Sequence, residues 1–303
     1  MNEKLSYSNL SIVIPARNEA ASLGPLLQTL KREFPAAQII VSDDGSIDQS
    51  AEIAQAANVE IVRRPYSGGN GAAIKAGARA ANRDLLLFMD ADGQHQPQDV
   101  PKLLSKLSEG YDMVVGARTP GGQANWHRGL ANAIYNRLAS WMVGYKIQDL
   151  TSGFRVANRK KFMEFLHLLP NGFSYPTTST MAFFRAGYTV AYSPINVQKR
   201  TLGTTSHVRL WRDGVRFFLI IFKIGTLYSP LKIFIPASAF FLLSGIMYYG
   251  YTFFTQHRFT NMSVLLFSAA VIIFLIGLVS EQITSLMYGG GSSETPGASE
   301  GRR

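Results

Sequence analysis

The chain has 303 residues, no cysteine, 47% hydrophobic and 17% charged residues, and a formal net charge of +10. A charged fraction below the roughly 25% of soluble domains excludes disorder for most of the chain and indicates contact with lipid. The absence of cysteine excludes disulfides, thiolate metal sites and cysteine nucleophiles, and the basic excess indicates anionic partners.

The first two thirds of the chain alternate short aliphatic runs with helical patterns, which is typical of an α/β domain with a mostly parallel sheet. Strands are expected at Leu10–Pro15, Gln38–Ser42, Val59–Arg63, Asp84–Met89 and Asp112–Gly116. Asn18 is expected to cap the helix that follows the first strand, and Asp48 the helix that follows the second.

Polar residues cluster directly after three of these strands, at residues 15–19 (PARNE), 43–46 (DDGS) and 90–94 (DADGQ). Ligands of open α/β sheets bind outside the carboxyl ends of the strands, so the three clusters predict one site. Asp90 and Asp92 are two residues apart and can share one ion in an extended segment. Their oxygen atoms favour Mg²⁺ or Mn²⁺. His95, close by, is interpreted as a structural or surface residue.

A glycine-rich stretch at residues 68–77 (GGNGAAIKAG) opens the next helix. It matches neither the phosphate-binding P-loop nor the dinucleotide-binding fingerprint. Two interpretations remain open. Its backbone amides could approach a phosphate, or it could be a flexible loop followed by a small-residue helix that packs on the sheet.

Basic residues concentrate before the most apolar part of the chain. Residues 198–232 hold seven basic residues and one acidic residue, and so supply +6 of the +10. The basic residues at 209, 212, 216 and 223 share one helical face, which predicts an amphipathic helix in the lipid headgroup layer over residues 208–230. A DNA-binding helix is the disfavoured alternative, and no nucleic-acid partner is expected.

Two runs without Lys, Arg, Asp or Glu, at 233–257 and 259–280, are each long enough to span a bilayer as a helix. A buried helical hairpin is the second interpretation. The basic block is expected on the cytoplasmic side of the cell membrane, and two spans would bring both termini there. No N-terminal signal peptide is visible. The expected parts are therefore a catalytic α/β domain, an interfacial segment, a transmembrane hairpin and a disordered tail, at residues 1–206, 207–230, 231–288 and 289–303.

Six motifs together resemble family 2 glycosyltransferases, and in particular the group of dolichol-phosphate mannose synthase and bacterial polyisoprenyl-phosphate glycosyltransferases. They are VIPARNE (13–19), SDDGSID (42–48), GNGAAIKAG (69–77), DADGQ (90–94), GAR (116–118) and DLTSGFR (149–155). The match covers residues 10–206, and the hairpin resembles that of the bacterial members. The resemblance implies a GT-A fold and inverting transfer of a hexose from a UDP- or GDP-sugar to undecaprenyl or dolichyl phosphate.

The resemblance also implies roles for individual residues. The donor pocket is expected to comprise Pro15, Ala16, Arg17, Glu19, Asp43, Asp90, Ala91 and Arg118. Asp43 would hold the base or the ribose. The family often has an aromatic residue at the position of Arg17, and this difference leaves the base preference open. Mg²⁺ or Mn²⁺ would be ligated by Asp90, Asp92 and Gln94.

The catalytic residues are expected to be Asp92, Asp149 and Arg200. Arg200 matches a family arginine that contacts phosphate and would stabilise charge developing on the nucleoside diphosphate. His207, which stands where the family has a lysine, is an acceptor candidate. Asp149 is a candidate for orienting the acceptor or acting as a base, or it caps the turn at Thr151 and Ser152. Arg155 could hold acceptor phosphate or pair with Asp149, and Ser152 is a further acceptor candidate.

The acceptor class separates the remaining hypotheses. A polyprenyl phosphate has a second pKa near ~6 and is largely dianionic at neutral pH, so it needs no strong base. A neutral lipid hydroxyl, the alternative acceptor, would need one. A third hypothesis is a non-enzymatic membrane scaffold that binds nucleotide sugar. A homo-oligomer is a possible partner arrangement that the sequence leaves open.

Overall fold

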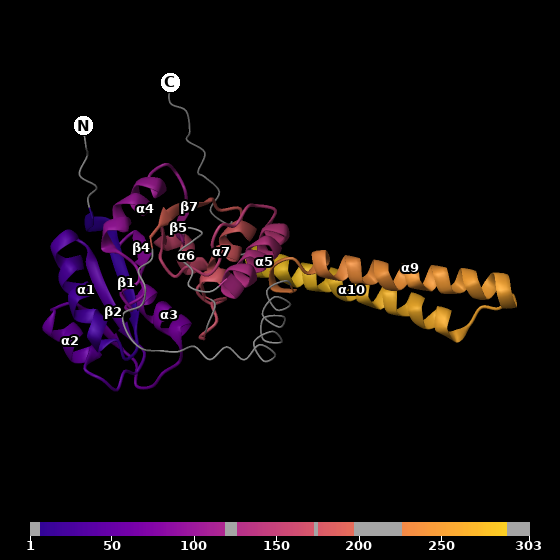
Figure 1. Ribbon diagram of the computed structural model, residues 1–303, viewed down its shortest axis with the longest axis horizontal. Helices are drawn as coiled ribbons and strands as arrows, with labels where there is room; N and C mark the ends of the chain where they lie inside the picture. The colour runs from indigo at the N-terminus through magenta and orange to yellow at the C-terminus, as the bar shows by residue number, and fades with distance from the viewer. Residues whose placement is uncertain (1–6, 119–125, 173–174, 197–225, 290–303) are drawn as a thin grey trace, which may run out of the picture. The chain divides into compact units, whose positions relative to one another are not determined.

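The computed structural model describes residues 7–118, 126–172, 175–196 and 226–289 (Figure 1). The chain divides into two compact units, Met1–Ser206 and His207–Arg303, and each is described by itself. Of the predicted site residues, Arg200 and His207 lie outside the described ranges. Most of the predicted interfacial segment and of the predicted disordered tail lies outside them as well.

Seven strands form one sheet in the first unit, in the order β3-β2-β1-β4-β6-β5-β7. Their bounds are β1 Leu10–Ala16, β2 Gln38–Asp43, β3 Glu60–Arg63, β4 Leu85–Phe88, β5 Met113–Arg118, β6 Arg155–Asn158 and β7 Val190–Ile195. All neighbours pair in parallel except β6, which runs antiparallel to both β4 and β5. The mostly parallel α/β fold is confirmed, and the five predicted strands are each found within two residues.

Two strands, β6 and β7, were not among the predicted strands. The first has only four residues and begins with a fully buried arginine, Arg155. The second lies at the sheet edge with alternating burial and contains an exposed Pro194. A charged residue and a proline both weaken the apolar pattern by which a strand is recognised, although proline is tolerated on an edge strand.

Helices cover both faces of this sheet (Figure 1). The longer ones are α1 Ala20–Glu33, α3 Asn70–Ala80, α4 Val100–Leu107, α5 Trp126–Val143 and α7 Tyr175–Arg185, with the shorter α2 Ser50–Ala56, α6 Arg159–Glu164, η1 Tyr7–Asn9 and η2 Pro97–Asp99. Leucines of α1 and α4 form one core cluster with alternate residues of β1, among them Ile12 and Ile14. Each such side chain contributes about 1.5–3 kcal/mol when fully buried.

Helix α3 packs on the opposite face of β1 through its small residues. Gly77 lies directly against the side chain of Val13, where a Cβ atom would not fit. Ser42 Oγ donates to the carbonyl oxygen of Ala73 at 2.7 Å. The predicted small-residue helix on the sheet is therefore confirmed.

The start of α1 corrects one predicted cap. Asn18 has a left-handed backbone (φ 56°) and accepts a hydrogen bond from Ile47 N, and the residue before the helix is Glu19. Asp48 instead serves both helices, because its two carboxylate oxygens accept from Ala20 N (3.1 Å) and Ser50 N (3.0 Å), the first residues of α1 and α2. Asp48 was predicted to cap the second helix; the residue before that helix is Gln49, and Asp48 instead accepts from the amide of its first residue. The contact of Asp48 with the first helix was not predicted.

The second unit contains two long apolar helices, α9 Pro230–Gln256 and α10 Asn261–Gly289. Both are long and apolar enough to cross a membrane, with mean hydropathies of 1.7 and 2.8 in their spans. Only 6% and 17% of their most apolar stretches is buried, which favours a lipid-facing hairpin over a buried one. Gly245 packs against Phe267, and Ser238 Oγ donates to Ala270 O at 2.8 Å, so the two helices contact one another.

Candidate active site

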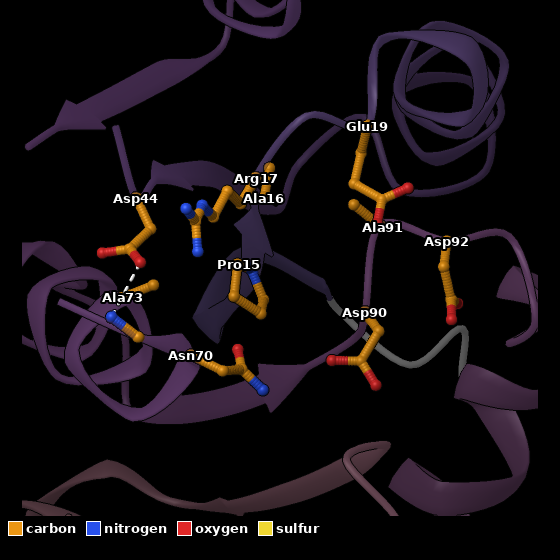
Figure 2. Close-up of a pocket in the computed structure, with 11 residues that line it drawn as sticks. Pro15, Ala16, Arg17, Glu19, Asp44, Asn70, Ala73, Asp90, Ala91 and Asp92 are labelled. Carbon is orange, nitrogen blue, oxygen red and sulfur yellow. Dashed lines mark hydrogen bonds between the residues drawn. The ribbon is translucent and has the colours of Figure 1, made fainter. Parts of the chain in front are cut away.

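A cavity of about 380 Å³ opens where β1, β2 and β4 end (Figure 2). It is lined by Pro15, Ala16, Arg17, Glu19, Asp44, Gly69, Asn70, Ala73, Asp90, Ala91 and Asp92. The three polar clusters that the sequence placed after these strands thus meet at one edge, as expected for parallel strands. Six of the eight predicted donor-pocket residues line the cavity; the exceptions are Asp43 and Arg118.

The carboxylate that faces the cavity from β2 is Asp44, and its neighbour Asp43 lies inside the fold. Asp43 is fully buried, and its Oδ1 accepts from Ser46 N at 3.0 Å. Its Oδ2 lies 3.5 Å from Arg63 Nε. Asp43 is the last residue of β2, and both faces of this strand are buried, so the alternation of side chains along the strand does not separate Asp43 from Asp44.

Asp44 holds the glycine-rich loop in place. Its Oδ1 accepts from Arg64 Nη1 (2.8 Å) and Gly68 N (2.9 Å), and its Oδ2 from Ser67 Oγ (2.7 Å) and Gly69 N (2.8 Å). Burial raises the pKa of Asp44, but these hydrogen bonds and the Arg64 charge outweigh it, and the pKa is lowered. The carboxylate is therefore an anion whose acceptor sites are filled by the protein.

The backbone amides at the start of α3 also have partners within the protein. Gly71 N donates to Gly172 O at 3.1 Å, and Ala72 N donates to Asn171 O at 2.9 Å. With Gly68 N and Gly69 N bound to Asp44, four amides of this stretch are occupied. Of the two interpretations of the glycine-rich stretch, the geometry favours the packed helix over direct phosphate binding.

Gly71 should not tolerate a side chain. A Cβ atom there would collide with the backbone oxygen of Pro170, which cannot move aside as a flexible side chain could. We expect Gly71→Ala to destabilise the protein by about 1–3 kcal/mol, the usual cost of overpacking, and to lower its thermal midpoint. In the matched control, Gly24→Ala, the Cβ meets Ile53 at an ordinary 3.6 Å, so the midpoint should not fall. An equal fall in both variants would contradict the close approach of α3 to residues 170–172.

Carboxylates gather at the end of β4. Glu19, Asp90 and Asp92 line the same part of the cavity (Figure 2). Asp92 Oδ1 accepts a hydrogen bond from Gln94 N at 3.1 Å, which folds this turn back on itself. Within the described residues no group of three His, Cys, Asp or Glu side chains is placed to hold a metal ion. Two carboxylates and an amide still fit Mg²⁺, which takes one or two protein carboxylates and completes its shell with water and phosphate oxygens.

His95 lies behind these carboxylates and is buried. It is 7% exposed, so the surface interpretation is wrong and the structural one stands. Its ring stacks on Phe154, with centroids 5.1 Å apart and planes at 16°. Burial lowers the pKa of His95 and outweighs the opposing effect of Asp90 and Asp92, which favours the neutral imidazole.

Asp149 forms an ion pair with Arg118. Arg118 Nε lies 2.7 Å from Oδ2 and Nη2 lies 2.9 Å from Oδ1, and the backbone N of Arg118 also donates to Oδ2. Asp149 Oδ1 accepts from Thr151 N and Ser152 N, so the predicted turn cap is confirmed. The predicted pairing with Arg155 is wrong, because Arg118 takes that place.

The electrostatics of Asp149 oppose a role as a base. Burial raises its pKa, but the hydrogen bonds and charge of Arg118 outweigh burial and lower the pKa. A carboxylate with a lowered pKa binds a proton weakly. Arg118, in turn, does not line the cavity, because its guanidinium is engaged with Asp149 and Thr151.

Arg155 is an interior residue. It is 0% exposed, and its guanidinium donates to Pro176 O, Ser179 Oγ, Thr180 Oγ1 and Ser152 O. The predicted contact with acceptor phosphate is therefore wrong. Ser152 is also buried, and neither residue is among those that line the cavity. The sequence did not distinguish a buried arginine that ties β6 to α7 from one that binds a ligand.

Two family models match this chain. One, described as glycosyl transferase family 2, matches residues 11–166, which is more than half of the chain, and holds the three clusters of the cavity. The chain belongs to glycosyltransferase family 2. The second, described as the GtrB C-terminal hairpin, matches residues 229–286 of this glycosyltransferase and coincides with α9 and α10.

Relatives of this glycosyltransferase include two enzymes whose names combine mannose with polyprenol or with undecaprenyl phosphate. The polyprenol monophosphomannose synthase of Mycolicibacterium smegmatis is 30% identical over 64% of this chain and 79% of its own length. The undecaprenyl-phosphate mannosyltransferase of Micrococcus luteus is 31% identical over 63% of this chain and 84% of its own length.

A solved structure shares the fold of the glycosyltransferase domain. Glucosyl-3-phosphoglycerate synthase of Mycobacterium tuberculosis, in complex with Mn²⁺, UDP and glucosyl-3-phosphoglycerate, superposes with a TM-score of 0.55 at 21% identity. The match covers 70% of this chain and 77% of that chain. At this identity the likeness shows the fold alone.

Proposed function

We propose that this glycosyltransferase moves a hexose from a UDP- or GDP-sugar to a polyprenyl phosphate and inverts the anomeric carbon. The observation that carries the proposal is the cavity at the ends of β1, β2 and β4, lined on one side by Glu19, Asp90 and Asp92. In the same chain, α9 and α10 form an apolar hairpin long enough to hold such a cavity at a membrane. The names of the two mannosyl-transferring relatives support the same acceptor class.

The cavity offers separate surroundings for the parts of a nucleotide sugar. Arg17 and Asp44 lie away from the carboxylates of Asp90 and Asp92 (Figure 2). We assign the nucleoside to the former and the diphosphate to the latter. Asp90, Asp92 and Gln94 would hold a Mg²⁺ or Mn²⁺ ion, which offsets negative charge on a diphosphate and makes it a better leaving group. The fold relative that contains Mn²⁺ and UDP supports this assignment.

The acceptor chemistry fits the absence of a strong base in the described site. A polyprenyl phosphate is already largely dianionic at neutral pH, with a second pKa near ~6, and can attack without losing a proton to the protein. A single attack opposite the leaving diphosphate inverts the anomeric carbon. Asp149, the predicted base, has a lowered pKa and is held by Arg118. Its role here is to orient the turn at Thr151 and Ser152.

The catalytic domain and both termini are assigned to the cytoplasmic side of the cell membrane. Seven of the eight charged residues at 198–232 are basic, which is the bias of cytoplasmic flanks. Nucleotide sugars are cytoplasmic compounds, so this orientation gives the donor direct access to the cavity.

An acceptor and donor screen tests the proposal. Purified full-length protein in lipid nanodiscs is incubated with Mn²⁺, with UDP- or GDP-sugars, and with undecaprenyl phosphate or diacylglycerol. We expect a polyprenyl-phosphate-linked hexose with at least one donor and no product on diacylglycerol. Product on the hydroxyl lipid alone would contradict the proposed acceptor. Binding of nucleotide sugar without transfer to either lipid would favour a scaffold instead.

A further inference from the structure

His95 carries a buried polar atom that lacks a partner. Among the described residues, Nδ1 of its imidazole has no hydrogen-bond partner, although the side chain is 7% exposed. A buried donor or acceptor that is left unsatisfied is destabilising, so such atoms are rare in folded proteins. The nearest carboxylate oxygen across a possible ion pair is Oδ2 of Asp90, at 4.0 Å, just beyond hydrogen-bond length. A small movement would therefore bring His95 Nδ1 and Asp90 Oδ2 within hydrogen-bond distance.

The imidazole cannot supply much of that movement. Its ring stacks on Phe154 at 5.1 Å, and Phe154 is itself 0% exposed. The carboxylate of Asp90 is more exposed than the His95 ring, because its side chain is 34% exposed and faces the cavity (Figure 2). The movement that shortens the distance between His95 Nδ1 and Asp90 Oδ2 would therefore come from Asp90.

A second segment limits where that carboxylate can go. A Cβ atom on Gly153 would lie 2.7 Å from Asp90 Oδ2 and 3.3 Å from its Cγ, so the backbone just before β6 touches the carboxylate. Asp90 thus lies between the His95 ring and the Gly153 backbone, which are 58 residues apart in the sequence. This arrangement leaves one narrow range of orientations for the carboxylate.

We propose that His95 is a positioning residue for Asp90: its Nδ1–H donates to Oδ2 when donor and cation fill the cavity, and so fixes the carboxylate toward them. The inference rests on the proposed function. A hydrogen bond to the outer oxygen of a ligating carboxylate typically contributes 10- to 100-fold to metal affinity, because it restricts the ligand to its binding orientation.

Two substitutions at one position separate the hydrogen bond from the packing. His95→Phe keeps a flat ring against Phe154 and removes the donor. His95→Asn loses the ring and can place its amide N–H close to where Nδ1 lies. Gly153→Ala retains His95 and crowds Asp90 out of its position, which gives a variant independent of the histidine.

The readout is the dissociation constant of Mn²⁺ in the presence of UDP or GDP, measured by electron paramagnetic resonance on full-length protein in nanodiscs without acceptor. We expect about a tenfold or greater weakening for His95→Phe and for Gly153→Ala, and less than about threefold for His95→Asn. Thermal midpoints check that each variant is folded. A purely structural role would instead make His95→Asn the worse variant, since it loses the stacked ring.

The possible failures are distinguishable. Wild-type affinity in His95→Phe would overturn the positioning role whatever the result for Gly153→Ala, and would leave the proposed function intact. If the unmodified protein binds no Mn²⁺ with either nucleotide, the metal assignment of the proposed function and the positioning role both fall. The acceptor has no part in this measurement, so the acceptor screen can fail without affecting it.

Discussion

Asp92→Ala should lower turnover by about 100- to 1,000-fold, the loss typical when one group that stabilises developing charge is removed. Asp92 lines the cavity beside Asp90, and its carboxylate is one of two that follow β4 there (Figure 2). The loss should fall on the rate constant for transfer, because the missing oxygen ligand serves the departing diphosphate. Added Mn²⁺ should restore only part of the activity.

The fold should survive this change, since Asp92 lies in a turn at the cavity and not in the core. We expect the thermal midpoint of Asp92→Ala to match that of the unchanged protein. Glu109→Ala is the matched control, because it removes a carboxylate that pairs with Lys106 on the exposed surface. That variant should keep full activity. Full activity in Asp92→Ala would rule out the metal role of Asp92.

Removing Asp149 should affect stability first. Asp149→Asn would leave the Arg118 guanidinium, itself only 30% exposed, without its anion. Breaking a mostly buried ion pair by removing one partner costs about 3–5 kcal/mol, because the remaining charge is uncompensated. Arg118→Gln should cost a similar amount. The double variant should lose less than the sum of the two, because the pair is already broken in each single variant.

Thermal unfolding of the four proteins in one detergent measures this cycle. If Asp149 were a base, Asp149→Asn would abolish transfer with an unchanged midpoint, and the effects of the two substitutions on stability would add. The exposed pair Lys106–Glu109 is the control, and Glu109→Gln should shift stability by less than about 1 kcal/mol.

The pH dependence of stability has a definite sign. The pKa of Asp149 is lowered in the folded protein, so its stabilising effect is present above the ordinary aspartate pKa of about 3.9 and is lost as the pH falls through the lower folded value. The difference in midpoint between the unchanged protein and Asp149→Asn should therefore be constant near neutral pH and shrink in acid.

The sequence predicted where the site lies better than it predicted which side chains pair with one another there. The clusters at residues 15–19, 43–46 and 90–94 follow apolar strands, and parallel strands necessarily bring their ends to one edge. Six predicted residues line the cavity for that reason. The pairing of Asp149 with Arg118 could not be read in the same way, because residues 31 positions apart meet only through the order of strands in the sheet.

Residues that share a motif can still face different ways. Asp43 and Asp44 are adjacent and chemically identical, yet one is inside the fold and the other is at the cavity. Arg155 looks like a ligand-binding arginine in sequence, but it is buried and its Nη1 donates to Pro176, Ser179 and Thr180. In both cases the surroundings of the side chain decide the role, and these depend on packing that a linear motif does not contain.

Strand β6 runs antiparallel to both of its neighbours, so the chain enters β6 at the edge of the sheet where β4 ends. Most of the cavity wall is built from chain that leaves β1, β2 and β4, whereas Gly153 belongs to chain that enters β6. Pairing of Arg155 with both Phe88 and Val115 fixes the register of that entry. A slip of one residue would turn Arg155 to the opposite face of the sheet and move Gly153 away from Asp90. The segment that enters β6 is therefore more constrained than the loops that follow β1, β2 and β4, because the pairing of β6 with β4 and β5 fixes where that segment must end.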